Sequence, residues 1–143
     1  MKKMTKLFLI ITLITAICLG NAPIYASASE PLSVTPRWSN ANSITADFSA
    51  SSSGGDVFIN YTGYKDSFAN AVVSVKLQKK FLLFFWTDVD EWSSTSTNCS
   101  DILTHTFSLN GTGTYKAIFT VEIFGINGNV DTYTTEIESK YSN

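Results

Sequence analysis

The chain has 143 residues, 44% of them hydrophobic, and a formal net charge of −2 from ten basic and twelve acidic side chains. This length corresponds to one domain that is large enough for its own core. An acidic chain without a basic cluster lacks the electrostatic footprint of nucleic-acid binding, so that class of partner is excluded from the expectations.

The first 28 residues are predicted to be a secretory signal peptide. Lys2, Lys3 and Lys6 form a basic head, residues 7–19 form an apolar segment, and residues 26–28 (Ala-Ser-Ala) supply small residues for cleavage. A thirteen-residue helix spans roughly 20 Å, which is less than the hydrocarbon core of about 30 Å, so this segment is too short for a membrane anchor. We expect a secreted protein, extracellular or associated with the cell envelope.

Two alternatives to cleavage after Ala28 remain open. Cleavage after Ala26 would leave a slightly longer chain. Lipid attachment at Cys18 is disfavoured. The pattern that resembles a bacterial lipidation site has Gly, Ala or Ser just before the cysteine, and here that position is Ile17.

Cleavage after Ala28 changes the charge and the cysteine count. The mature chain, Ser29 to Asn143, keeps seven bases and all twelve acids, and its net charge is −5. Cys99 becomes its only cysteine, so no intrachain disulfide forms and stability comes from packing. We expect Cys99 to be partly buried, with a bond to another chain as the alternative.

Residues 29–42 are predicted to be an extended leader, and residues 43–143 a single β domain. Apolar and polar residues alternate along the domain, and Ser, Gly and Asn turns interrupt them, which is typical of strands. No window has sustained helical periodicity. The expected strands are 44–48, 57–61, 73–77, 81–92, 103–109, 115–124 and 130–139.

The run from Phe81 to Trp86 breaks the alternation. Either this strand is buried on both faces, or a hairpin tip carries a hydrophobic patch that marks a binding or membrane-contact site. The candidate binding residues are Phe84, Trp86 and Trp92. The two tryptophans are six residues apart, so on a regular strand they would point to the same face and form an aromatic platform. Core packing is the alternative for both tryptophans.

The candidates for catalysis and metal binding are few. His105 lies on the same strand face as Leu103 and Phe107, which favours packing over catalysis, and a pair with Cys99 would lack an orienting residue. Two Cys or His residues in the mature chain do not make a structural zinc site. Asp88 and Asp90 share strand parity and offer oxygen ligands for calcium, but a solvated acidic edge is favoured. We therefore expect no catalytic residue, no metal and no cofactor.

The segment from Leu109 to Tyr115 is similar to the tyrosine corner of Greek-key sandwiches, in which the phenol bonds back to an upstream backbone group. An ordinary turn before a core tyrosine is the alternative. The strand count and this segment together predict an all-β, antiparallel Greek-key sandwich of about seven strands, immunoglobulin-like or fibronectin III-like in plan.

Four motifs support a resemblance to a known family: residues 35–38 (Thr-Pro-Arg-Trp), residues 75–79 on a central strand, the Trp86–Trp92 region, and residues 113–116. The chain resembles a family of small exported proteins from Gram-positive bacteria, known as a domain of unknown function. The resemblance covers most of residues 35–139 and implies an export role and a β fold, with no activity or site residues. The apolar run replaces a polar hairpin of that family.

These observations predict a secreted, non-catalytic sandwich, not an enzyme, that binds an extracellular protein, a glycan or an envelope component. The alternative is a secreted antagonistic or membrane-active protein that uses the run from Phe81 to Trp86.

Overall fold

The structure, a computed structural model, describes residues 38–142. These residues form seven β-strands and no helix. The predicted signal peptide and residues 29–37 of the predicted leader lie outside the described residues. The strands are β1 (Ala41–Ser51), β2 (Gly54–Gly63), β3 (Phe68–Phe81), β4 (Phe85–Ser96), β5 (Ser100–Phe107), β6 (Gly113–Gly125) and β7 (Val130–Tyr141).

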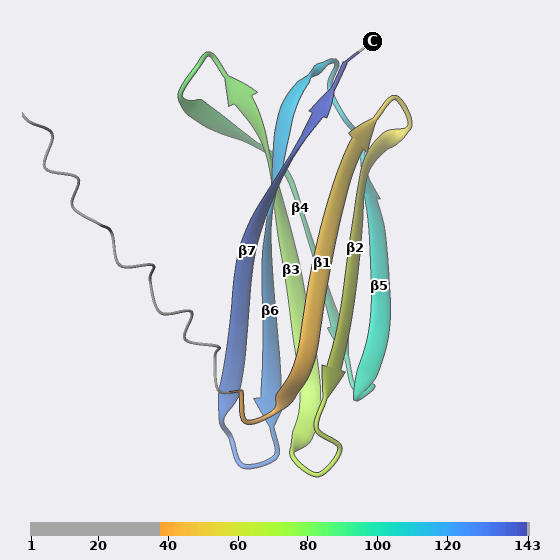
Figure 1. Ribbon diagram of the computed structural model, residues 1–143, viewed down its shortest axis with the longest axis vertical. Helices are drawn as coiled ribbons and strands as arrows, with labels where there is room; N and C mark the ends of the chain where they lie inside the picture. Colours follow the sequence, from red (N-terminus) through yellow and green to blue (C-terminus); the bar gives the residue numbers. More distant parts are fainter. Residues whose placement is uncertain (1–37, 143) are drawn as a thin grey trace, which may run out of the picture. The chain divides into compact units, whose positions relative to one another are not determined.

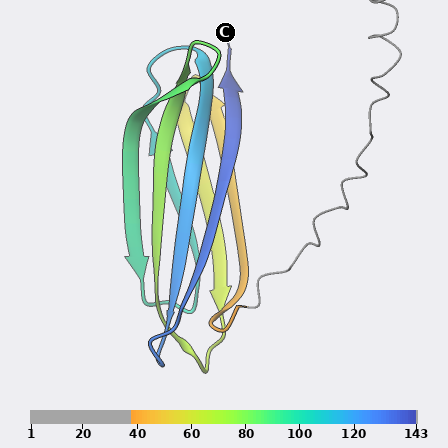
Figure 2. The ribbon, with the colours of Figure 1, turned by 90° about the vertical axis from the view of Figure 1, so that its left-hand side faces the viewer.

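The strands form two antiparallel sheets that face each other (Figures 1 and 2). One sheet has three strands in the order β1-β2-β5, and the other has four in the order β4-β3-β6-β7. The prediction of an all-β chain with seven antiparallel strands is confirmed. Within the described residues β1 begins at Ala41, two residues before the predicted start of the domain, and β4 continues to Ser96 into the Ser/Thr-rich segment.

The core lies between the sheets because alternate side chains of each strand point inward. The alternation is clearest in the middle of β3 and β6, where Val73, Val75 and Leu77 lie beside Phe119 and Val121 in the same sheet, and all five are 0% exposed. The inner face of β2 supplies further core residues. Within residues 38–142 the whole buried core lies between Asn40 and Ile123, so a chain that starts at Ser29 would contain every described strand and the core.

The two sheets are held together differently along their two sides. On the side of β1 and β7, the Asp131 carboxylate accepts from the backbone amides of Asn40 and Ala41, and the Ala50 amide donates to Ser139 Oγ at 2.9 Å. On the side of β4 and β5, the Ser96 hydroxyl donates to the Asp101 carboxylate at 2.7 Å, and the rings of Trp92 and His105 stack.

The strand ends form two groups of turns. The β3–β4 turn, the β1–β2 turn and the β5–β6 connection lie at the upper end in Figure 1. The β2–β3 and β6–β7 connections lie at the lower end, where the described chain begins.

Candidate functional site

The tip of the β3–β4 hairpin exposes five consecutive large apolar side chains. They are Phe81 (61% exposed), Leu82 (70%), Leu83 (76%), Phe84 (81%) and Phe85 (63%). We call these five residues the apolar tip. The sequence left open whether this run is core or surface, and the structure places it on the surface.

The exposure follows from how far each strand extends. The last pair between β3 and β6 joins Lys79 to Tyr115, and beyond it Lys80 and Phe81 pair with β4 alone. The end of the hairpin is therefore a two-stranded ribbon with no neighbouring strand and no facing sheet to cover it.

The turn itself holds an unusual backbone conformation. Leu82 has φ +56°, which lies in the left-handed region that favours glycine. A leucine there costs about 1–2 kcal/mol, because its Cβ crowds the following carbonyl oxygen. Such strain is concentrated at functional sites, which motivates a functional interpretation of the tip.

Trp86 lies just below the apolar tip on the outer face of the four-stranded sheet, and two lysines hold it there. The Nζ atoms of Lys116 and Lys80 lie 4.6 Å and 5.4 Å from the centroid of its ring. Lys116 also forms an ion pair with Glu136 at 3.0 Å, and its side chain is 12% exposed. The half-buried Trp86 is therefore fixed between charged neighbours next to the tip.

Trp92 does not share a surface with Trp86. The register of β4 shifts at Val89, which has no partner between the pairs Gln78–Asp88 and Leu77–Asp90. This bulge reverses the strand's parity, so Trp86 points outward and Trp92 points inward. The platform predicted from their shared parity is therefore absent. Trp92 instead stacks on His105 with the ring centroids 5.0 Å apart.

The same bulge separates the two acids that the sequence placed on one face. Asp88 lies opposite Gln78 on the outer face, and Asp90 lies opposite Leu77 on the inner one. Asp88 forms an ion pair with Lys76 at 2.8 Å and accepts from Gln78 Nε2 at 2.8 Å, and these two partners lower the pKa of its carboxyl. The shared face proposed for calcium is absent, and no group of three or more His, Cys, Asp or Glu residues within 38–142 is placed to hold a metal ion.

His105 and Cys99 have separate environments. His105 lies between the rings of Trp92 and Phe107, in an edge contact of 4.7 Å with the latter. Cys99 is half-buried, as predicted, and its thiol donates to the Gly63 carbonyl at 3.2 Å. Packing is therefore the observed role of the His105 ring.

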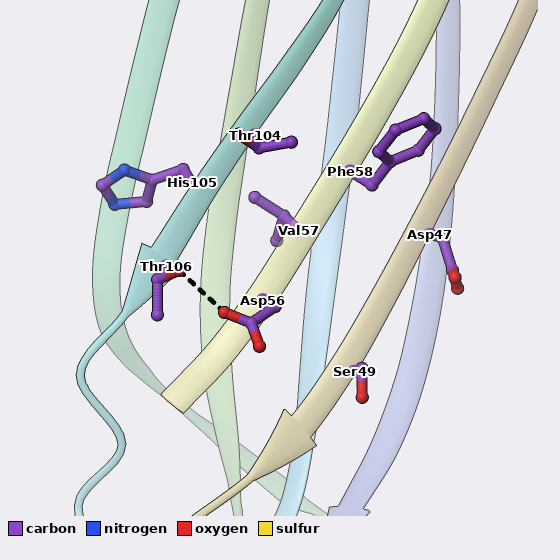
Figure 3. Close-up of a pocket in the computed structure, with 8 residues that line it drawn as sticks. All are labelled: Asp47, Ser49, Asp56, Val57, Phe58, Thr104, His105 and Thr106. Carbon is purple, nitrogen blue, oxygen red and sulfur yellow. Dashed lines mark hydrogen bonds between the residues drawn. The ribbon is translucent and has the colours of Figure 1, made fainter. Parts of the chain in front are cut away.

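A shallow depression on the outer face of the three-stranded sheet was not predicted (Figure 3). Its volume is about 340 Å³. Among the residues that line it, Thr106 Oγ1 donates to Asp56 Oδ1 at 2.7 Å, and the Phe58 side chain is 41% exposed. The alternating pattern predicted that polar residues of β1, β2 and β5 point outward. It could not predict that the pairing of these strands brings those residues together in one depression. Its lining residues are Asp47, Ser49, Asp56, Val57, Phe58, Thr104, His105 and Thr106.

Comparisons with known proteins add a weak structural likeness. The chain is similar to a solved structure of superoxide reductase (neelaredoxin) from Ignicoccus hospitalis, with a TM-score of 0.37 and 6% identity over 72% of this chain and 83% of that one. A variant of the same reductase has a TM-score of 0.35 and 7% identity over 73% and 83%. No family model and no curated protein matches the chain.

These findings contradict the sequence-based expectations of a non-catalytic role and of a protein that is not an enzyme. The structures that resemble the chain are those of a reductase, and we withdraw both expectations. The alternative, a secreted antagonistic or membrane-active protein, is withdrawn with them, whereas membrane contact was a separate expectation on which these structures have no bearing. At this identity the likeness concerns the arrangement of strands, and no activity of the reductase is transferred.

Proposed function

We propose that the β3–β4 hairpin attaches this domain to a lipid membrane surface. The observation that carries the proposal is the apolar tip, with side chains 61–81% exposed at the end of a two-stranded ribbon. Large apolar side chains that are contiguous and exposed mark interaction sites. No helix within residues 38–142 is long and apolar enough to span a bilayer.

The size of the tip suits reversible attachment. Full burial of a Leu or Phe side chain is worth about 1.5–3 kcal/mol, so five side chains that are roughly two-thirds exposed give a gross gain of about 5–10 kcal/mol. Part of this gain is offset by the lost freedom of the attached domain. Trp86 lies below the tip, at the depth where tryptophan is enriched at membrane interfaces.

We also propose that the domain is a Greek-key sandwich of the immunoglobulin or fibronectin III type. Two observations support this. Three strands in the order β1-β2-β5 face four in the order β4-β3-β6-β7. The Tyr115 hydroxyl donates to the Gly111 carbonyl at 2.7 Å, as a tyrosine corner requires.

Export remains part of the proposal, together with the resemblance to the exported Gram-positive family. The basic head, apolar segment and cleavage motif of residues 1–28 support it. An exported domain would meet the outer side of the membrane or another envelope surface. N-terminal sequencing of protein recovered from the medium should begin at Ser29, and a retained N-terminus would contradict cleavage.

Vesicle binding by the exported form, Ser29 to Asn143, tests the attachment. The double variant Leu83→Ser/Phe84→Ser removes the two most exposed side chains of the tip and should abolish co-sedimentation with phospholipid vesicles. The matched control is Ile102→Ser/Ile126→Ser, which removes two apolar side chains of 60% and 73% exposure away from the tip. The control should bind like the parent chain.

The folding of each variant is checked by its free energy of unfolding in urea. The tip variant should retain the parent value within about 1 kcal/mol, because its side chains contribute little to the folded state. Vesicle binding that survives the tip substitutions, or is lost equally in the control, would refute the attachment.

A further inference from the structure

The lysines of this acidic chain are concentrated beside the apolar tip. The last two rungs of the four-stranded sheet before the tip contain Lys79 and Lys80 on β3 and Lys140 on β7, and no acidic residue. The acids nearest to them, Asp88 and Glu138, lie one rung further from the tip. The charge next to the tip is therefore positive, whereas the mature chain carries a net charge of −5.

From this arrangement we infer that the membrane surface bound by the hairpin is anionic, and that these three lysines contact its phosphate groups. The inference rests on the proposed attachment and names the lipid class that it requires. A surface of zwitterionic lipid would bury the apolar tip, but it would offer the lysines no net negative charge to bind.

The spacing along β3 places the charges at the right depth. A strand rises about 3.3 Å per residue, so Lys79 and Lys80 begin within roughly 7 Å of Phe81. When the tip enters the hydrocarbon boundary, long lysine side chains at that distance extend into the headgroup layer. Lys140 on β7 broadens the contact across the sheet.

The observed neighbours of Lys79 and Lys80 leave the charge of both lysines uncompensated. Lys80 lies over the ring of Trp86, and Lys79 donates to the Asn110 carbonyl and lies 5.3 Å from the centroid of Tyr115. These partners are neutral, so they orient the ammonium groups without cancelling the charge. Lys116 differs, because its ion pair with Glu136 neutralises it.

A protein partner is a weaker match for this surface. The tip is a projecting ribbon with the positive charge set behind it, whereas protein interfaces have an apolar core enclosed by a polar rim. An apolar end backed by lysines and a tryptophan matches the order of layers from hydrocarbon to headgroup.

The test compares vesicles of phosphatidylcholine with vesicles that also contain phosphatidylglycerol, using the exported form. Each lysine near an anionic surface strengthens binding about fivefold, so the parent chain should prefer the anionic vesicles by about a hundredfold. The double variant Lys80→Gln/Lys140→Gln should lose about 25-fold on anionic vesicles and nothing on neutral ones. Added salt should weaken the anionic preference, because it shortens the range of the attraction.

The matched control is Lys65→Gln/Lys76→Gln, which changes the net charge equally but lies away from the tip. Lys65 is in the β2–β3 connection, and Lys76 is paired with Asp88. This control should retain the anionic preference, and an equal loss in both double variants would overturn the inference. If the first double variant unfolds, Lys140→Gln alone, at an exposed position, should lose about fivefold.

Two outcomes separate this inference from the attachment on which it rests. Equal affinity for both kinds of vesicle would overturn the anionic surface and leave attachment through the tip intact. Absence of binding to either kind, or self-association through the tip without vesicle binding, would overturn both.

Discussion

Replacing Tyr115 with phenylalanine should destabilise the domain by about 1 kcal/mol, because it removes one hydrogen bond and little else. The Tyr115 side chain is 0% exposed, and its hydroxyl donates to the Gly111 carbonyl at 2.7 Å. Phenylalanine keeps the ring, its packing and its contact with the ammonium group of Lys79. The change is thus limited to a single oxygen atom.

The magnitude follows from the exposure of the two partners. A neutral hydrogen bond contributes about 0.5–1.5 kcal/mol net, and an acceptor left buried without a partner costs about 1–3 kcal/mol. Gly111 lies in an exposed turn with φ +71°, so water can reach its carbonyl after the substitution. The loss of stability therefore falls in the lower of the two ranges, at about 1 kcal/mol. For a domain of this size, that loss corresponds to a fall in Tm of about 4–8 °C.

Urea unfolding followed by tryptophan fluorescence measures this difference. Tyr64→Phe is the matched control, because Tyr64 is 47% exposed in the β2–β3 connection and should change stability by less than about 0.5 kcal/mol. Equal stability of Tyr115→Phe and the parent chain would show that the bond does not support the corner. It would also remove one of the two supports for the Greek-key proposal.

Two further predictions concern the opposite end of the sandwich. Burial raises the pKa of the Asp131 carboxyl, but hydrogen bonds from the amides of Asn40, Ala41 and Ser39 outweigh it and lower the pKa below its ordinary value. A carboxyl with a lowered pKa stabilises the fold above its unfolded pKa of about 3.9, and this stabilisation is lost as the pH falls through the folded value. Asp131→Asn should therefore be less stable than the parent chain at pH 7 and approach it in acid, as urea titrations at several pH values would show; a difference independent of pH would contradict this. Gly125→Ala should be strongly destabilising, since its Cβ would collide with the Oδ1 of the buried Asn40, and an unchanged Tm would exclude such close packing.

Much of the fold could be predicted from local periodicity. Alternation of apolar and polar residues identified the strands, and it placed residues such as Val75 and Phe119 on buried faces, where both are 0% exposed. The prediction succeeds because successive side chains of a strand alternate between its two faces. A two-residue period therefore indicates both that a segment is a strand and which of its residues face the core. The order of the strands in the two sheets is non-local and came from the tertiary structure.

The candidate site could be predicted in part. The apolar run was identified because it breaks the alternation, and Phe84 indeed lies at its most exposed point. The partnership of Trp86 with Trp92 was inferred from even spacing, which assumes an unbroken strand. The unpaired Val89 invalidates that assumption, since one extra residue reverses every side chain beyond it.

The sequence by itself determined that this chain forms strands, where most of them lie, which residues can be core, and that the run from Phe81 to Phe85 is anomalous. The tertiary structure decided that this run is surface, that lysines from β3 and β7 lie together behind it, and that the two tryptophans lie on opposite faces. The physical reason is the range of the interactions. Alternation is a property of neighbouring residues, whereas exposure at a hairpin end depends on how far a strand such as β6, distant in sequence, continues beside it.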